Sequence, residues 1–185
     1  DLEDVVPDMY ILGKALGGGI VPVSAVVADR SVLGVFTPGS HGSTFGGNPV
    51  SMAVGHAVLD VIEAENLPAR AVSTGEALMA GYRDLARRLP VIGDVRGMGL
   101  MQALELVVDE AAGDRTPNPG AVLKLFEETK KRKLLIGKGG LKGNVVRISP
   151  PLNATAAEIK EGLAILEQSF AAFARKMCRA GLDGL

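Results

Sequence analysis

One lysine, Lys14, stands where the sequence could carry out covalent chemistry. It ends a short apolar segment and precedes the glycine-rich run at residues 15–19, and residues 15–59 contain only two charged side chains, Asp29 and Arg30. Removal from water lowers the pKa of a lysine amine, and the neutral amine is the nucleophile that forms a Schiff base with an aldehyde. Lys14 is therefore a candidate nucleophile, although a surface lysine before a glycine turn has the same spacing.

A second candidate is the loop at residues 39–49, with the sequence GSHGSTFGGNP. Ser43 and Thr44 offer hydroxyl groups, the glycines free backbone N–H groups, and Asn48-Pro49 is typical of an N-cap followed by proline at the first helical position. These groups beside a helix N-terminus favour an anion. The segment lacks the GxxxxGK[ST] spacing of a phosphate loop, so an anion site and an ordinary glycine-rich loop both fit it.

A third candidate is Arg147, which lies among β-branched apolar residues in the segment Val145–Ile148. A guanidinium in such a segment needs a partner, and a carboxylate held by two parallel hydrogen bonds is the usual one. A salt bridge to a nearby acidic side chain would satisfy Arg147 equally well.

Other charged or metal-binding patterns favour plain structural roles. The basic run Lys130–Lys133 falls in the last turn of a predicted helix, where cations complement the helix dipole. Residues 137–140 lack the spacing and hydroxyl of a phosphate loop. His41 and His56 are 15 residues apart without a nearby cysteine, so we expect no metal site.

Composition narrows the function classes further. A net charge of −1 with 47% apolar residues excludes a disordered chain and argues against a nucleic-acid-binding surface. The apolar runs are too short and too interrupted for a membrane span. The one cysteine, Cys178, excludes a disulfide framework and favours a reducing compartment. We therefore expect a cytoplasmic protein that binds neither nucleic acid nor membrane.

Strands alternating with helices, followed by a smaller strand-and-helix module, predict an α/β protein with a break near residues 85–91. The first long helix is apolar nearly all round and is expected to be buried on most faces. Residues 109–117 are expected to form a polar loop, and residues 155–158 a capping box. The predicted helices cover 49–65, 69–88, a segment beginning at 119 and one beginning at 156; the predicted strands cover 9–12, 21–28, 91–97, 100–108, 134–136 and 145–148.

Several segments together resemble the class III pyridoxal-phosphate aminotransferases. They are PDMYILGKALGGG at 7–19, PVSA at 22–25, GSHGSTFGGNP at 39–49, VRGMGL at 95–100 and VRISPPL at 146–152. The first and third segments are most similar to ornithine-type members, and acetylornithine-type members are close behind. The resemblance reaches to about Phe173 and implies a partial fold type I aminotransferase: residues 1–88 would be the end of the large cofactor domain with a linking helix, and residues 89–185 the small C-terminal α+β domain.

The resemblance also implies roles for the candidate residues. Lys14 would bind pyridoxal phosphate covalently and then move a proton between substrate and cofactor. Thr44, with Ser43 beside it, would bind the cofactor phosphate, in this family typically from the partner subunit of a homodimer. Arg147 would hold a carboxylate of the amino-acid or 2-oxo-acid substrate.

Members of this family normally have a further half upstream of the segment that corresponds to Asp1. That half carries a second phosphate-binding loop, an aromatic residue stacked on the cofactor ring and an acidic residue paired with its nitrogen. We therefore expect no efficient transamination by this chain alone. The implied activity of the complete enzyme is transfer of the ornithine δ-amino group to 2-oxoglutarate; the alternatives are an acetylornithine or other ω-amino-acid aminotransferase, and a catalytically inactive chain or interaction module.

Overall fold

The structure, a computed structural model, describes residues 4–182, with side chains up to Phe173, and its internal contacts divide the chain into two compact units. The first unit is Asp1–Leu67 and the second is Pro68–Leu185. Helix α3 (Leu67–Arg88), which was expected to link two domains, packs into the core of the second unit. The boundary near residue 88 between the domains of a complete enzyme stays a prediction.

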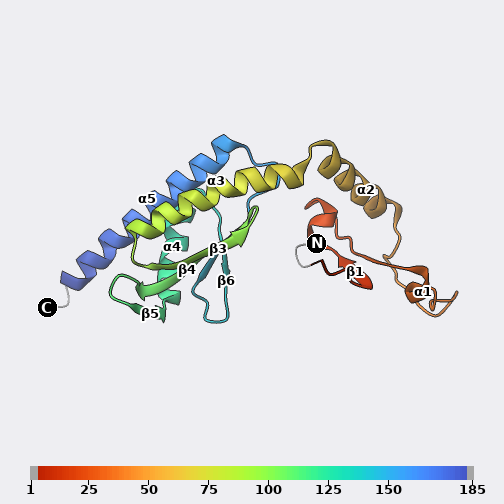
Figure 1. The fold of residues 1–185 in the computed structure, drawn as a ribbon, viewed down its shortest axis with the longest axis horizontal. Coiled ribbons are helices and arrows are strands. Elements are labelled where there is room, and N and C mark those ends of the chain that lie inside the picture. Colours follow the sequence, from red (N-terminus) through yellow and green to blue (C-terminus); the bar gives the residue numbers. More distant parts are fainter. Residues whose placement is uncertain (1–3, 183–185) are drawn as a thin grey trace. The chain divides into compact units, whose positions relative to one another are not determined.

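The first unit contains one two-stranded antiparallel sheet and one long helix (Figure 1). The two strands pair from Met9↔Ala28 to Leu12↔Ala25. Lys14 follows the first strand after one glycine and opens a single 3-10 turn, so the chain reverses at the candidate nucleophile. The elements are β1 (Met9–Leu12), η1 (Lys14–Gly17), β2 (Ala25–Ala28), α1 (Arg30–Leu33) and α2 (Pro49–Ala64).

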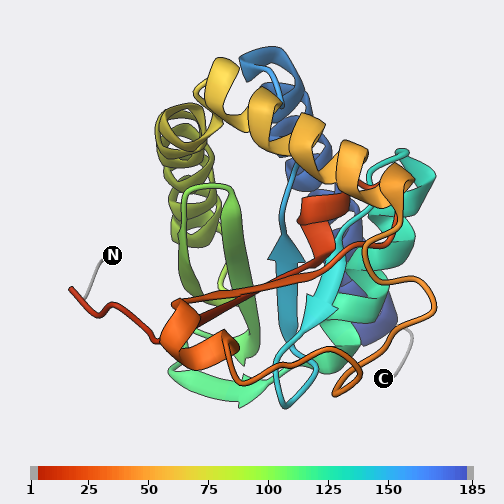
Figure 2. The same ribbon diagram turned by 90° about the vertical axis from the view of Figure 1, so that its right-hand side faces the viewer.

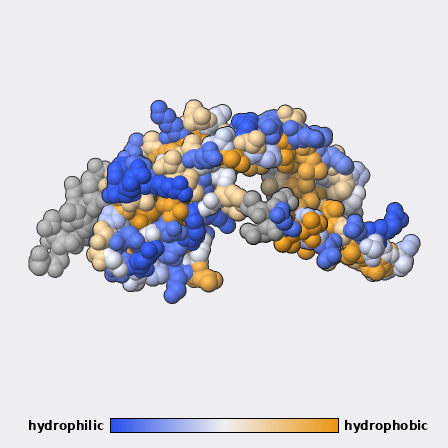
Figure 3. Space-filling view, viewed as in Figure 1, coloured by the Kyte–Doolittle hydropathy of each residue, from blue (hydrophilic) through white to orange (hydrophobic). Residues whose placement is uncertain are grey.

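Apolar side chains lie on the surface of the first unit rather than in a core (Figure 3). Ile11 is 82% exposed and Phe45 is 81% exposed. The expectation that the helix at 49–65 is buried on most faces is wrong for this chain, because α2 buries only Ser51 and Gly55. Its packing partner in this unit is the short turn η1, which can cover one narrow stripe of the helix.

The second unit is an antiparallel sheet whose core is shared with three helices (Figures 1 and 2). The strand order is β3-β4-β7-β6, and β5 pairs with β4 off this path. On β4 the side chains alternate, so Leu104 and Leu106 are fully buried while Glu105 is partly exposed. The remaining elements are β3 (Ile92–Met98), β4 (Met101–Asp109), β5 (Asp114–Pro117), α4 (Pro119–Lys131), β6 (Gly137–Gly139), β7 (Val145–Ile148) and α5 (Ala156–Leu182).

Three helix starts follow the capping signals in the sequence. The Asn48 side chain accepts a hydrogen bond from the Ser51 N–H at 2.9 Å, and Asn118 does the same for Ala121. At the third start the Thr155 hydroxyl accepts from the Glu158 N–H, and the Glu158 carboxylate accepts from the Thr155 N–H. That backbone N–H holds the pKa of Glu158 below its usual range. The predicted N-caps and capping box are confirmed.

Two strand predictions in the second unit are wrong. Residues 134–136 are not a strand; the pairing with β7 begins one residue later, at Gly137. The loop expected at residues 109–117 contains β5, which pairs with the end of β4. Both observed strands are held by backbone pairing and lack an alternating apolar pattern, so periodicity could not indicate them.

Helix α3 touches the turn between β3 and β4 with its backbone. A Cβ on Gly75 would lie 2.2 Å from the carbonyl oxygen of Gly99. The buried Gln102 amide donates to the carbonyl oxygens of both glycines, at 2.7 Å and 2.6 Å. Only glycine at position 75 permits this approach, and the approach holds the β3–β4 turn against the helix.

No helix in the part of the chain that the structure describes is long and apolar enough to cross a membrane.

Replacing Gly75 by alanine is expected to lower the free energy of unfolding of the second unit by at least about 2 kcal/mol, because the new methyl group overlaps backbone that cannot move aside. Gly162→Ala is the matched control, since Gly162 is also helical and has nothing within 4 Å of an added Cβ. It should raise stability by about 0.5–1 kcal/mol. Urea unfolding followed by circular dichroism measures both, and equal effects would contradict the contact.

Candidate functional site

Lys14 lies at a cavity of about 720 Å³ formed entirely within the first unit. The glycine-rich loop contributes to the same cavity, so the structure brings two of the three candidate segments together. Ser43 lines this cavity and Thr44 does not. The other walls come from the end of β1, the chain before β2 and the first turn of α2: Ile11–Gly13, Pro22–Ser24, Phe45–Asn48, Ser51 and Met52.

The backbone of Lys14 adopts the left-handed conformation, with φ 53°. Such a value is uncommon for a residue with a side chain and costs on the order of 1–3 kcal/mol. The turn that imposes it packs closely on its surroundings: Gly17 is buried, and a Cβ on Gly18 would lie 2.8 Å from the Val58 side chain of α2. Packing between η1 and α2 therefore fixes where the chain turns at Lys14.

The Lys14 side chain is exposed in the described structure. The sequence left open a lysine removed from water and a surface lysine before a glycine turn, and in this chain Lys14 lies at the surface. The glycines after Lys14 allow the tight turn and its close contact with α2. They do not bury the Lys14 side chain within the first unit.

A short hydrogen-bond chain fastens the glycine-rich loop to the segment that follows the lysine turn. The Asn48 amide donates to the Phe45 carbonyl oxygen and to the Ser51 hydroxyl, both at 3.0 Å. The Ser51 hydroxyl in turn donates to the Pro22 carbonyl oxygen at 3.3 Å. Ser51 is 6% exposed. This residue holds two walls of the cavity together.

Sequence reasoning identified Asn48 only as a helix cap and missed Ser51. The available signal was a hydroxyl residue three positions after an asparagine N-cap, a spacing at which the two side chains meet. The partner at Pro22 could not be foreseen, because it lies 29 residues away in the chain.

Ser43 keeps a hydroxyl proton available at the cavity. Its oxygen accepts a hydrogen bond from the Gly46 N–H at 2.9 Å, which orients the side chain but does not use its proton. Thr44 is exposed and lies outside the cavity lining. Ser43 and Thr44 are therefore placed differently although they are adjacent.

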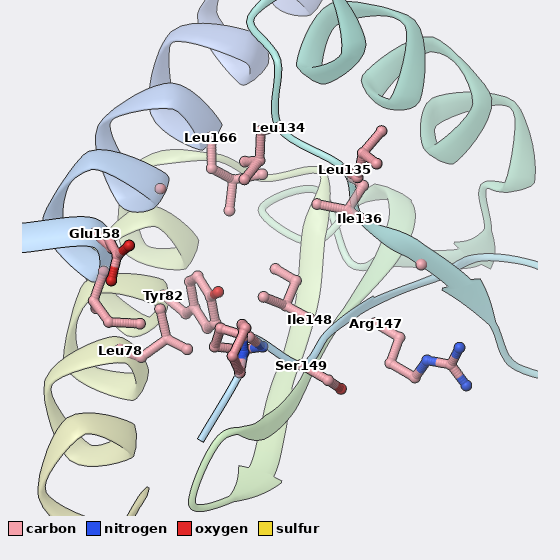
Figure 4. A pocket seen from close by; sticks show the side chains of 15 residues that line it. Leu78, Tyr82, Leu134, Leu135, Ile136, Arg147, Ile148, Ser149, Glu158 and Leu166 are labelled. Carbon is pink, nitrogen blue, oxygen red and sulfur yellow. The ribbon is translucent and has the colours of Figure 1, made fainter. Parts of the chain in front are cut away.

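Arg147 lies in the second unit, at the edge of another cavity of about 400 Å³. Figure 4 shows the Arg147 side chain directed away from the apolar side chains that line this cavity. Arg147 is exposed and makes no ion pair with any side chain described up to Phe173. The sequence left two partners open for Arg147, a ligand carboxylate and a nearby acidic side chain. The described residues supply no acidic side chain that pairs with it.

Tyr82 lies among the apolar side chains that line the second cavity (Figure 4). Tyr82 is 2% exposed, and its hydroxyl makes no hydrogen bond within the described residues. Burial raises the pKa of Tyr82 well above its usual range.

No group of three or more His, Cys, Asp or Glu side chains that could hold a metal ion occurs among the described residues. Neither His41 nor His56 belongs to such a group. Cys178 lies outside the residues whose side chains are described.

Comparison with known proteins identifies the family. The family model described as "Aminotransferase class-III" matches residues 1–170. The chain belongs to the class III aminotransferases. Its relatives include an ornithine aminotransferase of an Exiguobacterium species, 44% identical over 170 residues, and one of Bacillus cereus, 46% identical over 152 residues. These alignments cover 89% and 82% of this chain but only 37% and 34% of the relatives, so the chain spans little more than a third of their length.

Solved aminotransferase structures share the fold. The acetylornithine aminotransferase of Elizabethkingia anophelis is 37% identical with a TM-score of 0.80, covering 92% of this chain and 42% of that one. An ornithine aminotransferase of Toxoplasma gondii, described as having partial occupancy of PLP at its active site, is 33% identical with a TM-score of 0.81; the match covers 94% of this chain and 39% of that one. The two units therefore form part of the class III aminotransferase fold, as the sequence predicted.

Tyr82→Phe is expected to remove a loss of stability at alkaline pH. The folded pKa of Tyr82 lies above the unfolded value of about 10, so its contribution to stability is complete below that pH and declines above it, by up to about 1.4 kcal/mol per pH unit. Urea unfolding from about pH 8 to about pH 11 should show a shallower decline for Tyr82→Phe than for the unmodified chain. Tyr10→Phe is the control, because Tyr10 is 44% exposed; equal slopes for both variants would contradict the role of burial.

Proposed function

We propose that this chain carries the cofactor lysine and the small domain of an ornithine-type aminotransferase. The complete enzyme transfers the ornithine δ-amino group to 2-oxoglutarate and yields glutamate semialdehyde and glutamate. The observation that carries the proposal is the common cavity of Lys14 and Ser43 in a class III aminotransferase chain. The curated relatives at 44–46% identity, named ornithine aminotransferases, support the substrate.

The groups around the cavity fit pyridoxal phosphate, the cofactor on which class III aminotransferases depend. A primary amine matches its aldehyde, and a hydroxyl with a free proton beside the N-terminus of the 16-residue helix α2 matches its phosphate. The volume of about 720 Å³ lies in the range of small-molecule and cofactor sites. When bound, the cofactor supplies an aldehyde that captures amines and a ring that accepts electrons.

Each residue of the chain has a separate task in this proposal. Lys14 Nζ would hold the cofactor and, as a free amine, would take the proton from the substrate carbon that bears the amino group. The left-handed backbone and the η1–α2 packing fix the point from which the Lys14 side chain projects. Ser43 donates its hydroxyl proton to the phosphate.

Thr44 and Arg147 do not line the Lys14 cavity of the first unit, and each has a separate task in this proposal. Thr44 is exposed and outside that cavity, which suits binding of a phosphate in the second subunit of a homodimer. Arg147 holds a substrate carboxylate by a charge-assisted pair. The substrates are an amino acid and a 2-oxo acid, and the enzyme acts in the cytoplasm.

A second candidate function is an acetylornithine or other ω-amino-acid aminotransferase. It is favoured by the Elizabethkingia acetylornithine aminotransferase, whose 37% identity exceeds the 35% and 33% of two structures of Toxoplasma ornithine aminotransferase. A chain that folds but does not turn over is a third candidate. Turnover of the complete enzyme with ornithine or acetylornithine and 2-oxoglutarate distinguishes the three candidates. Semialdehyde from one donor selects that donor, and a complete, folded enzyme that forms no product selects the third.

Pyridoxal phosphate followed by borohydride is expected to label Lys14 in preference to the other lysines. The cavity places the Lys14 amine beside a phosphate-binding hydroxyl, so the reduced adduct should form there at the lowest cofactor concentrations. Peptide mass spectrometry locates and quantifies the adduct.

Lys14→Arg should abolish this preferential labelling, because a guanidinium keeps the charge but forms no Schiff base. Lys138→Arg, in β6 of the second unit, is the control and should leave the labelling of Lys14 unchanged. Equal labelling of Lys14 and Lys138 in the unmodified chain would refute the assignment of Lys14.

A further inference from the structure

One face of the second unit's sheet carries two arginines in a single row across the strands. Arg96 on β3 pairs with Ala103 on β4, and Ala103 pairs with Arg147 on β7. Arg147 pairs on its other side with Gly137 on β6. Residues directly opposite each other in antiparallel strands project to the same face, so the row alternates two long cationic side chains with two of the smallest residues.

The two arginines differ in whether an acidic side chain pairs with them. Arg96 contacts the carboxylate of Asp94 and lies 2.7 Å from Glu105 Oε2. Arg147 makes no ion pair with the side chains described. Glu105 is diagonal to Arg147 across the β4–β7 pair, a separation of about 7–8 Å that a long side chain can span. Arg96 therefore engages the acid that could otherwise neutralise Arg147.

The Arg147 side chain lies close to Gly137, the residue opposite it on β6. A Cβ on Gly137 would lie 3.2 Å from Arg147 Nε, 3.3 Å from the Arg147 carbonyl oxygen and 3.5 Å from Arg147 Cβ, and the first two distances are shorter than ordinary van der Waals contact. Gly137 does not have a positive φ, so its backbone conformation would accept another residue. The requirement for glycine comes from the arginine that lies across it.

We propose that Gly137 is a positioning residue for Arg147. Its bare backbone lets the guanidinium lie across β6 with both donor edges free, so that a substrate carboxylate is bound by two hydrogen bonds. A side chain at residue 137 displaces Nε and leaves the carboxylate with a poorer fit. This inference rests on the proposed assignment of Arg147 to a substrate carboxylate.

The test compares Gly137→Val with Gly139→Ala in the whole chain. Gly139 lies on the same strand and face, and nothing lies within 4 Å of an added Cβ there. The Nε–Hε signal of Arg147 is followed by nuclear magnetic resonance, assigned by its loss in Arg147→Lys. Glutarate is the probe, because it carries two carboxylates like 2-oxoglutarate; dimethyl glutarate is its uncharged control.

We expect glutarate, but not its dimethyl ester, to shift the Arg147 signal in the unmodified chain and in Gly139→Ala. In Gly137→Val the signal should move before any addition, and the apparent affinity for glutarate should fall about tenfold, the loss of one charge-assisted hydrogen bond. Urea unfolding checks that each variant is folded; if Gly137→Val is not, Gly137→Ala takes its place.

The outcomes separate the inference from the proposed function. An Arg147 signal and a glutarate affinity that are the same in the Gly137 variant and in Gly139→Ala overturn the positioning role. If glutarate shifts nothing in any chain but the Gly137 variant still moves the Arg147 signal relative to Gly139→Ala, positioning is supported and the carboxylate assignment fails.

Discussion

The contact of α3 with the β3–β4 turn is the constraint on which the second unit depends. Gly75 allows the helix backbone to reach the carbonyl of Gly99, and Gln102 bonds to both. The contact fixes where β4 begins, and β4 pairs with three other strands. A shift of β4 by one residue would exchange the fully buried Leu104 with Ala103 and bring the wrong residue beside Arg147. The place of the candidate carboxylate-binding arginine thus follows from a glycine and a glutamine distant from it in sequence.

The first unit is held by a different kind of interaction. It has almost no buried apolar side chains, and its arrangement depends on glycine packing between η1 and α2 and on the hydrogen bonds of Asn48 and Ser51. Polar contacts of this kind fix direction and distance, whereas an apolar core supplies most of the stability of a domain. The first unit is accordingly well suited to presenting Lys14 and Ser43 but poor in stabilising burial of its own.

Local signals in the sequence predicted much of this arrangement. Helices begin at Asn48, Asn118 and Thr155 because each of these side chains accepts a hydrogen bond from the backbone N–H three residues later, a relation contained within one turn. The alternation on β4 is likewise visible in the sequence, since one face of that strand is buried. Lys14 and Ser43 were identified from residue types, but their common cavity depends on Ser51 reaching Pro22, a contact across 29 residues that no local pattern contains. The prediction that α2 is buried failed for a related reason. Apolar residues on all faces of a helix indicate that it packs against other elements, but they do not indicate whether this chain contains those elements.

Arg96 and Arg147 show why residue type alone does not define a binding site. Both lie on β-strands, both face the same side of the sheet, and a sequence motif of the family contains each of them. Arg96 on β3 lies beside Asp94 and Glu105 and is neutralised by them, and the pair with Glu105 joins β3 to β4 on this face of the sheet. Arg147 has alanine and glycine as neighbours in the row, and its nearest diagonal acid is already paired. Among the side chains described up to Phe173, Arg147 has no acidic partner, whereas the acid nearest to it across the strands is paired with Arg96. Its charge is therefore available for the carboxylate that we propose it binds.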